Sequence, residues 1–212
     1  MPPLQVLVVG ATGGLGQTLV REALKRGHTV GVLVRSKEKL SDTFVTDEVA
    51  RFAQVHISDG TDAATIASAL KGVDVILNGV GSRPDVALAL ASAAKTANTK
   101  KLIHVAGSTN VLGEDGVTLE WKRWITRWSG AEAAFKSHQA CIDAIAAAGV
   151  NYVVFCPSFM KSVGKVSTPP VAVQVNRPSG EFVSYEDAAV VMVDAAEKSD
   201  WDRQLITAAT QQ

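Results

Sequence analysis

Short runs of apolar, β-branched residues alternate along the chain with longer, alanine-rich segments whose apolar positions recur at helical spacing. The expected strands are residues 5–9, 29–34, 52–57, 73–77, 101–106, 151–155 and 204–207. The expected helices are residues 14–26, 62–70, 84–97, 131–148 and 185–198. Strands that are apolar at nearly every position are typical of sheets buried on both faces. The alternation predicts an α/β Rossmann fold, a doubly wound parallel sheet formed by a single domain over residues 1–212.

Two long connections interrupt this alternation. Residues 108–130 separate the fifth strand from its helix, and residues 161–180 separate the sixth strand from the last helix. Both leave from carboxyl ends of strands, where ligands lie in open α/β sheets. We therefore expect both insertions to form lids over a pocket at that edge.

The run VLVVGATGGLGQTLV carries an apolar strand into a glycine-rich turn and then into a helix. Gly10 allows a tight turn, Gly13 lets a pyrophosphate approach the backbone, and Gly16 lets the helix lie close to the strand. The orphan amides and the dipole at the start of the helix then hold the negative charge. Within a βαβ unit, this pattern predicts a dinucleotide-binding site.

The second strand ends in VLVRSKEKL. Cofactors with a free ribose 2′-hydroxyl usually meet an acidic residue here, and those with a 2′-phosphate meet a cation. Arg35 can bind a phosphate with two hydrogen bonds, and Ser36 can add a hydroxyl. The sequence therefore favours NADP(H) over NAD(H); the alternative is that Arg35 is only a solvated surface residue.

Composition narrows the possible partners, metal sites and location of the protein. The chain carries 21 Lys and Arg against 21 Asp and Glu, so no net charge attracts nucleic acid or an anionic membrane. Two cysteines, and four histidines without a ligand-like pair, favour neither a disulfide framework nor a metal site. The start lacks the pattern of a signal peptide and no apolar run is long enough to span a membrane, so we expect a cytoplasmic protein.

Several motifs together resemble a known family. GATGGLG opens the first helix, NGVG follows the fourth strand, and HVAGS ends the fifth. Further matches are SDGTD, AAAGVNYVVFCPSFM and GEFVSYEDAA. Nearly the whole chain is thus similar to atypical short-chain dehydrogenases/reductases, in particular the NmrA-like and biliverdin reductase B–flavin reductase-like proteins that bind NAD(P)H.

The resemblance implies where the cofactor lies. The residues implied to hold the pyrophosphate are Gly10, Thr12, Gly13, Gly14, Leu15 and Gly16. Those implied at the 2′-phosphate, the adenine and the ribose are Arg35, Ser36, Asp59, Gly60, Asn78, Gly79, Val80 and Gly81. Those implied beside the nicotinamide are Ala106, Ser108, Pro157, Ser158 and Phe159.

The chain departs from the larger superfamily at the catalytic pair. Ketone-reducing members use Tyr-x-x-x-Lys, in which the lysine lowers the tyrosine pKa, but neither Tyr152 nor Tyr185 is followed by lysine at that spacing. The tyrosine's place falls on Ala134, and the lysine's place on His138 or, with a one-turn slip, on Lys136. Carbonyl reduction by a phenolic acid is therefore disfavoured. The small flavin and biliverdin reductases also lack this tyrosine.

Two residues remain as candidates for catalysis. Ser108 ends a buried strand where a nicotinamide would lie, although such a serine can also satisfy backbone groups at a strand end. His138 can donate a proton or hold a ribose hydroxyl; the alternative is a helix histidine that faces solvent. Cys156 takes the place of a usual arginine, and nothing near it in the sequence would activate its thiol.

The segment LEWKRWITRWSG places Trp121, Trp124 and Trp128 at helical spacing on one face. Such a stripe can form a lid over a flat acceptor, an oligomer interface or a membrane-surface helix. We expect it to pack on the domain and wall the pocket, because its segment leaves the carboxyl end of the fifth strand.

These observations favour an NADPH-dependent oxidoreductase that passes hydride to a small conjugated or aromatic acceptor, such as a flavin or quinone. Positioning would supply most of the catalysis, with help from Ser108 and His138. The rival hypothesis is a non-catalytic NADP(H) sensor of NmrA-like type. A nucleotide-sugar epimerase or dehydratase is disfavoured by the missing tyrosine. We expect a monomer or homodimer with a small-molecule substrate.

Overall fold

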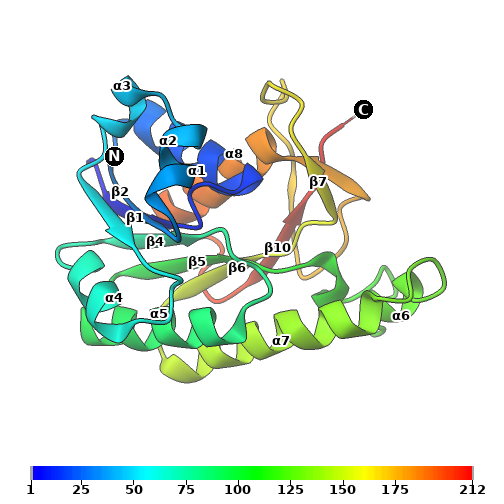
Figure 1. Cartoon of the computed structure of the whole chain (residues 1–212). Coiled ribbons are helices and arrows are strands. Elements are labelled where there is room, and N and C mark those ends of the chain that lie inside the picture. The colour runs from blue at the N-terminus through cyan, green and yellow to red at the C-terminus, as the bar shows by residue number, and fades with distance from the viewer. Residues whose placement is uncertain (1, 212) are drawn as a thin grey trace.

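The computed structural model describes residues 2–211 and is built around one large sheet (Figure 1). Its strands run in the order β3-β2-β1-β4-β5-β6-β10-β8. Their bounds are β1 Gln5–Val9, β2 Thr29–Val34, β3 Gln54–Ile57, β4 Val75–Asn78, β5 Lys101–Val105, β6 Tyr152–Phe155, β8 Val173–Val175 and β10 Leu205–Ala208. All neighbours are parallel except β10 and β8. The predicted doubly wound Rossmann fold is confirmed.

Helices cover both faces of this sheet (Figure 1). Helices α1 (Gly14–Lys25), α2 (Lys37–Thr43), α3 (Thr46–Val49) and α8 (Tyr185–Glu197) lie on one side. Helices α4 (Ala63–Ala69), α5 (Pro84–Thr96) and α7 (Ala131–Ala148) lie on the other. No helix within residues 2–211 is both long and apolar enough to cross a membrane.

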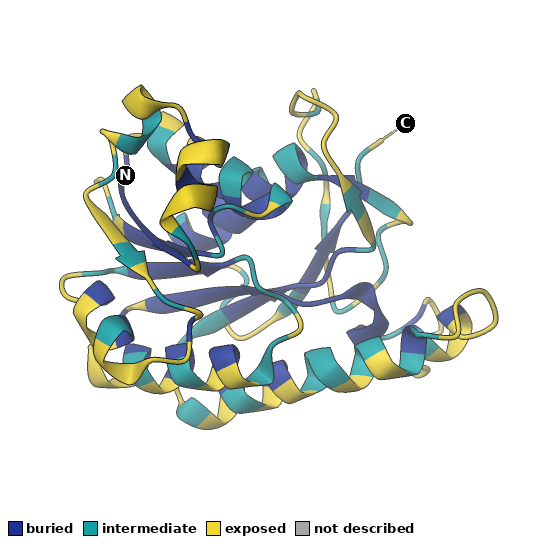
Figure 2. Cartoon of the chain, viewed as in Figure 1, coloured by how far each residue is buried: buried dark blue, intermediate teal, exposed yellow. Residues whose placement is uncertain are grey.

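The core follows from the alternation of side chains along the central strands. In β1, Val6 and Val8 join the buried cluster that includes Met192 of α8. Leu7 joins the cluster on the opposite face, which includes Leu90 of α5. Because successive side chains of a strand point to opposite faces, one apolar strand serves two cores. Figure 2 shows the central strands and the inner faces of the helices as buried.

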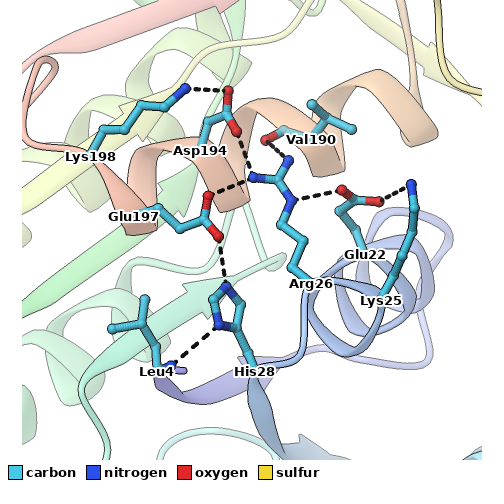
Figure 3. A network of polar contacts seen from close by, with 9 residues as sticks. All are labelled: Leu4, Glu22, Lys25, Arg26, His28, Val190, Asp194, Glu197 and Lys198. Carbon is cyan, nitrogen blue, oxygen red and sulfur yellow. Dashed lines mark hydrogen bonds and ion pairs between the residues drawn. The ribbon is translucent and has the colours of Figure 1, made fainter. Parts of the chain in front are cut away.

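A network of charged groups joins α1 to α8 (Figure 3). The Arg26 guanidinium donates to Asp194 at 2.6 Å and to Glu197 at 2.7 Å. His28 Nδ1 accepts a hydrogen bond from the Leu4 amide at 3.3 Å, so its Nε2 is the nitrogen that donates to Glu197, 3.0 Å away. The network joins the carboxyl-terminal ends of the two helices.

Most predicted elements lie within two residues of the observed ones. The third predicted strand, β3, is an edge strand whose side chains are mostly exposed. The second insertion is not only a lid. Part of it, β8, pairs antiparallel with β10 and extends the main sheet. The strands on either side of it, β7 (Phe159–Lys161) and β9 (Phe182–Ser184), form a small separate sheet.

Candidate functional site

The glycine-rich turn lies at the carboxyl edge of the sheet, between β1 and α1. Gly10 has a φ of +74°, and a Cβ there would lie 2.7 Å from Cγ2 of Val80. A Cβ at Gly16 would lie 2.1 Å from the Gly10 carbonyl oxygen. Gly10 is therefore required for the turn and Gly16 for the close approach of helix to strand, for the reasons that the sequence predicts.

Gly13 differs, because little of the protein itself fills the space beside it. It is the N-cap of α1 in an extended conformation, and the nearest atom to a Cβ there would be the Gly10 oxygen at 3.4 Å. The first hydrogen bond of the helix runs from the Gln17 amide to the Gly13 carbonyl at 2.9 Å. The amides that precede Gln17 in the helix are left without helical acceptors and can bind an anion.

Gly14 has a role that sequence reasoning missed. A Cβ on this residue would lie 2.5 Å from Cε2 and 2.7 Å from Cζ of Tyr185. The Tyr185 ring therefore occupies the side-chain space of Gly14. The third glycine of GATGGLG leaves room for a side chain from α8, and the only signal for it in the sequence is the Gly-Gly pair.

The end of β2 presents Arg35 to solvent, without an ion pair to any residue of the described chain. Ser36 is already engaged, since its hydroxyl accepts from the Lys39 amide at 3.1 Å and donates to Glu38 at 2.7 Å. Ser36 thus caps α2. Of the two residues predicted to bind a 2′-phosphate, Arg35 is the one with an unengaged polar group.

The pair predicted at the adenine shapes the turn after β3. Asp59 Oδ1 accepts from the Thr61 amide at 2.9 Å and from its hydroxyl at 2.6 Å. Gly60 has a φ of +89°, and a Cβ there would lie 3.0 Å from Cγ1 of Val86. The Asp59 side chain is exposed, so its carboxylate remains accessible to a ligand.

Asn78 supports the following loop from inside the protein. Its buried side-chain amide donates to Nδ1 of His104 at 2.9 Å, and its carbonyl oxygen accepts from the Val80 amide at 3.0 Å. Burial, and secondarily the proximity of His138, lowers the pKa of His104 to about 3, so this imidazole is neutral. Asn78 therefore acts on the loop through its side chain, and the surface offered to a ligand is that of Gly79, Val80 and Gly81. His104 was not predicted to have a role beyond the motif that contains it.

An apolar pocket of about 190 Å³ lies at the carboxyl ends of β5 and β6. Its lining is Ala106, Gly107, Ser108, Thr109, Trp124, Trp128, Ala134, His138, Pro157, Ser158, Phe159 and Met160. The Ser108 amide donates to the Pro157 carbonyl at 2.8 Å, which fixes the two turns that form the floor of the pocket. The structure thus brings Ser108 and His138, predicted from separate segments, to one pocket.

His138 lies in the pocket with its Nδ1 turned against Gly107. A Cβ at Gly107 would lie 2.6 Å from both Cε1 and Nδ1 of the imidazole. Nδ1 is buried and has no hydrogen-bond partner among residues 2–211, which leaves Nε2 as the nitrogen for a ligand. Burial also lowers the pKa of His138, which favours the neutral ring. Lys136, the alternative at this place, is exposed and pairs with Glu132 at 2.7 Å.

The tryptophans are only partly arranged as predicted. The helix α6 covers Trp121–Trp124 alone, so the stripe does not form one continuous face. Trp124 is buried in the wall of the pocket, with its ring 5.8 Å from that of Phe159 in an edge-to-face arrangement. Trp128 also lines the pocket, whereas Trp121 stacks on Phe135 at 5.6 Å. Two of the three tryptophans therefore form the pocket wall.

Cys156 does not line the pocket. It is fully buried, and burial raises the pKa of its thiol well above the usual range. A thiolate is the nucleophilic form of cysteine, so this residue is inert at neutral pH.

A family model described as NAD(P)H-binding matches residues 10–199. The chain belongs to this NAD(P)H-binding family. The match begins at Gly10, the first glycine of the turn, and includes the segments after β5 and after β6 that line the pocket. The matched residues include the free amides at the start of α1, which can bind an anion.

The chain is also similar to known proteins in sequence and in fold. The chain is 22% identical to the uncharacterized protein YwnB of Bacillus subtilis, over 98% of this chain and 99% of that protein. It is 26% identical to the isoflavone reductase homolog A622 of Nicotiana tabacum, over 91% of this chain and 64% of that longer protein. The fold is shared with a candidate NADH-flavin reductase of Streptococcus pneumoniae, with a TM-score of 0.73, 19% identity, and coverage of 98% and 100%.

Proposed function

We propose that this NAD(P)H-binding protein is an NADPH-dependent oxidoreductase that passes hydride to a small conjugated or aromatic acceptor, such as a flavin or quinone. The observation that carries the proposal is the apolar pocket, in which Ser108 and His138 lie among aromatic walls at the carboxyl edge of the sheet. A mostly apolar cavity with a few convergent polar groups is the usual form of a small-molecule site.

The residues of the turn fit the cofactor. The pyrophosphate would lie against the amides of Gly14 and Leu15, where the absent side chain of Gly13 leaves room. The nicotinamide end would reach Ala106 and the turn that begins at Pro157, which line the pocket. Arg35 supports the choice of NADPH, because its unpaired guanidinium suits a 2′-phosphate.

When bound, the reduced cofactor supplies a hydride, and the protein supplies position and hydrogen bonds. Trp124 and Phe159 offer aromatic faces that hold a flat acceptor and exclude water from it. Ser108 and the neutral His138 each offer a hydrogen-bond donor to an acceptor oxygen or nitrogen on which negative charge develops. A polarised, conjugated acceptor needs no phenolic acid, so Ala134 at the tyrosine's place is compatible with turnover.

A second candidate is a sensor that binds NADP(H) without turnover, as the resemblance to NmrA-like proteins implies. The observation that favours it is Ala134 itself, a lining residue with no proton to give where a ketone reductase has tyrosine. The pocket favours the enzyme, because a sensor needs no aromatic cavity beside the nicotinamide.

One assay separates the two. The purified protein is mixed with NADPH and a panel of flavins, quinones and linear tetrapyrroles, and the loss of nicotinamide absorbance is followed. If the protein is an enzyme, NADPH is oxidised with at least one acceptor. The rate of oxidation is then lower in Ser108→Ala and His138→Ala variants that still bind NADPH. Tight NADPH binding without oxidation by any acceptor would favour the sensor.

A further inference from the structure

Tyr185 is the first residue of α8, and it reaches across to the start of α1. Ser184 caps α8 through a hydrogen bond that its hydroxyl accepts from the Asp187 amide at 3.0 Å. The Tyr185 ring lies where the side chain of Gly14 would be, and its hydroxyl oxygen would be 3.0 Å from a Cβ on that residue. The hydroxyl end of the ring, not only its body, therefore lies at the glycine-rich turn.

The direction of this contact places the phenol near the amino-terminal end of α1. Every Cα–Cβ bond of an α-helix is tilted toward the amino terminus of the helix. Gly14 is the first helical residue of α1, so its unused Cβ direction leans toward the end of the helix at which the free amides lie. Tyr185 fills that position and thus lies beside the proposed pyrophosphate site.

The hydroxyl is available to a ligand. Tyr185 is half-buried, and its hydroxyl forms no hydrogen bond to any side chain or backbone group of the described residues. A phenol at neutral pH is a donor, and a donor to a charged phosphate oxygen forms one of the stronger hydrogen bonds in proteins.

The residues after Tyr185 hold its backbone in place. Glu186 accepts from the amides of Val163 at 3.1 Å and Gly164 at 3.2 Å. Asp187 accepts from the Ser167 amide at 2.8 Å and from the Thr210 hydroxyl at 2.6 Å. These bonds hold the start of α8, and the ion pairs of Arg26 with Asp194 and Glu197 hold its other end.

We propose that Tyr185 is a cofactor-binding residue whose hydroxyl donates a hydrogen bond to the pyrophosphate of the bound nucleotide. The proposal rests on the cofactor half of the proposed function and is independent of the acceptor. It also explains why Gly14 has no side chain, since any Cβ there would displace the phenol.

The test is a fluorescence titration of the protein with NADPH, and a parallel titration with adenosine 2′-monophosphate, which lacks the pyrophosphate. Tyr185→Phe keeps the ring and removes the donor, so it is expected to weaken NADPH binding about tenfold and to leave the nucleotide monophosphate unaffected. The matched control is Tyr152→Phe at the other tyrosine of the chain, in β6, which should change neither affinity.

A second variant tests the same contact from the other side. Gly14→Ala pushes the phenol away and should reproduce the loss of NADPH affinity. The double variant Gly14→Ala/Tyr185→Phe should lose no more than either single change, because both remove one interaction. Circular dichroism and thermal unfolding of each variant show that the fold is kept.

Three results would overturn the proposal. NADPH binding by Tyr185→Phe with wild-type affinity means that the ring only fills space. An equal loss of affinity for both nucleotides means a general distortion of the site. If the wild-type protein binds no NADPH, this proposal and the proposed function fail together, whereas binding without oxidation of any acceptor refutes only the enzymatic part.

Discussion

The imidazole of His138 occupies the space that a side chain at position 107 would need, with Cε1 and Nδ1 each 2.6 Å from the Cβ direction of Gly107. Gly107 lies two residues after the end of β5, on one side of the pocket, and His138 comes from the middle of α7. The glycine therefore sets where the histidine can lie.

Gly107→Ala should displace this imidazole and lower turnover about tenfold, because small displacements of catalytic groups are costly. NADPH affinity should remain near wild type, since the phosphate site is unchanged. Steady-state kinetics and NADPH titration measure the two quantities. The control is Gly31→Ala in β2, where a Cβ would meet its nearest atom at an ordinary 3.6 Å. Unchanged turnover in Gly107→Ala would mean that His138 has no part in the reaction.

Two glycines of the same turn should respond differently to alanine. Gly16→Ala should lower the free energy of unfolding by about 3 kcal/mol, because its Cβ would meet backbone atoms that cannot move away. Gly13→Ala should cost no more than about 1 kcal/mol, as expected for an N-cap, but should weaken NADPH binding at least tenfold. Urea unfolding and NADPH titration give both values. If Gly13→Ala lowered only the stability and Gly16→Ala lowered only the NADPH affinity, the proposed phosphate site would be contradicted.

Arg35→Asp should exchange a phosphate-binding cation for a residue that suits a free ribose. NADPH affinity should fall roughly 10- to 100-fold, as for the loss of charged hydrogen bonds, while NADH affinity stays the same or improves. Titrations with both cofactors measure this. The control Lys71→Asp reverses an exposed charge in the segment between α4 and β4. Equal losses for NADPH and NADH in Arg35→Asp would refute a 2′-phosphate role.

The two tryptophans of α6 should contribute differently to acceptor binding. Trp124→Phe should raise the KM for the acceptor about 3- to 10-fold, because Trp124 lines the pocket and contacts Phe159. Trp121→Phe should leave that KM unchanged, since Trp121 stacks on Phe135 and is absent from the pocket lining. Neither change should alter the Kd of NADPH. A common effect of both would mean that α6 acts as a single lid rather than through Trp124.

The buried His104 should make stability fall in mild acid. The unfolded chain binds a proton on this residue near pH 6.5, whereas the folded chain does so only near pH 3. The unfolded state thus binds more protons between these values, so stability is present above pH 6.5 and is lost as the pH falls through this window. The loss from pH 7.5 to pH 5 should be about 2 kcal/mol.

Urea unfolding at several pH values measures this loss. His104→Gln should remove most of it, and His56→Gln, on the exposed edge strand β3, should remove much less. A pH dependence that is the same in His104→Gln and the wild type would show that the carboxylates, not this histidine, determine acid stability.

The fold was predictable where one local pattern determines each element. The limits of α7 were predicted correctly because its alanine-rich sequence ends at Gly149, which has a φ of +70°. The short helices α2 and α3 were missed because polar segments of this length have no apolar period. Strand β8 was missed because three residues acquire their conformation only by pairing with β10.

The candidate site shows the same limit. The glycine-rich turn could be predicted because the turn at Gly10 and the close contacts of Gly13 and Gly16 with the Gly10 carbonyl are local in the sequence. The contacts of Tyr185 with Gly14 and of Asn78 with His104 join distant segments through side chains, and no spacing in the sequence encodes them. Ser36 was predicted to contact a 2′-phosphate, but its hydroxyl already bonds two residues close to it in the sequence, Glu38 and Lys39.

The position of β10 has a consequence for how the protein is made. The amide of Cys156 donates to the Ile206 carbonyl at 2.7 Å, so the turn at Pro157 is held by a strand that the ribosome delivers much later. The segments from β1 to β5, which include the glycine-rich turn, are all translated before that strand. The turn at Pro157, and with it the pocket wall, is therefore completed only after the last strand of the sheet has been synthesised.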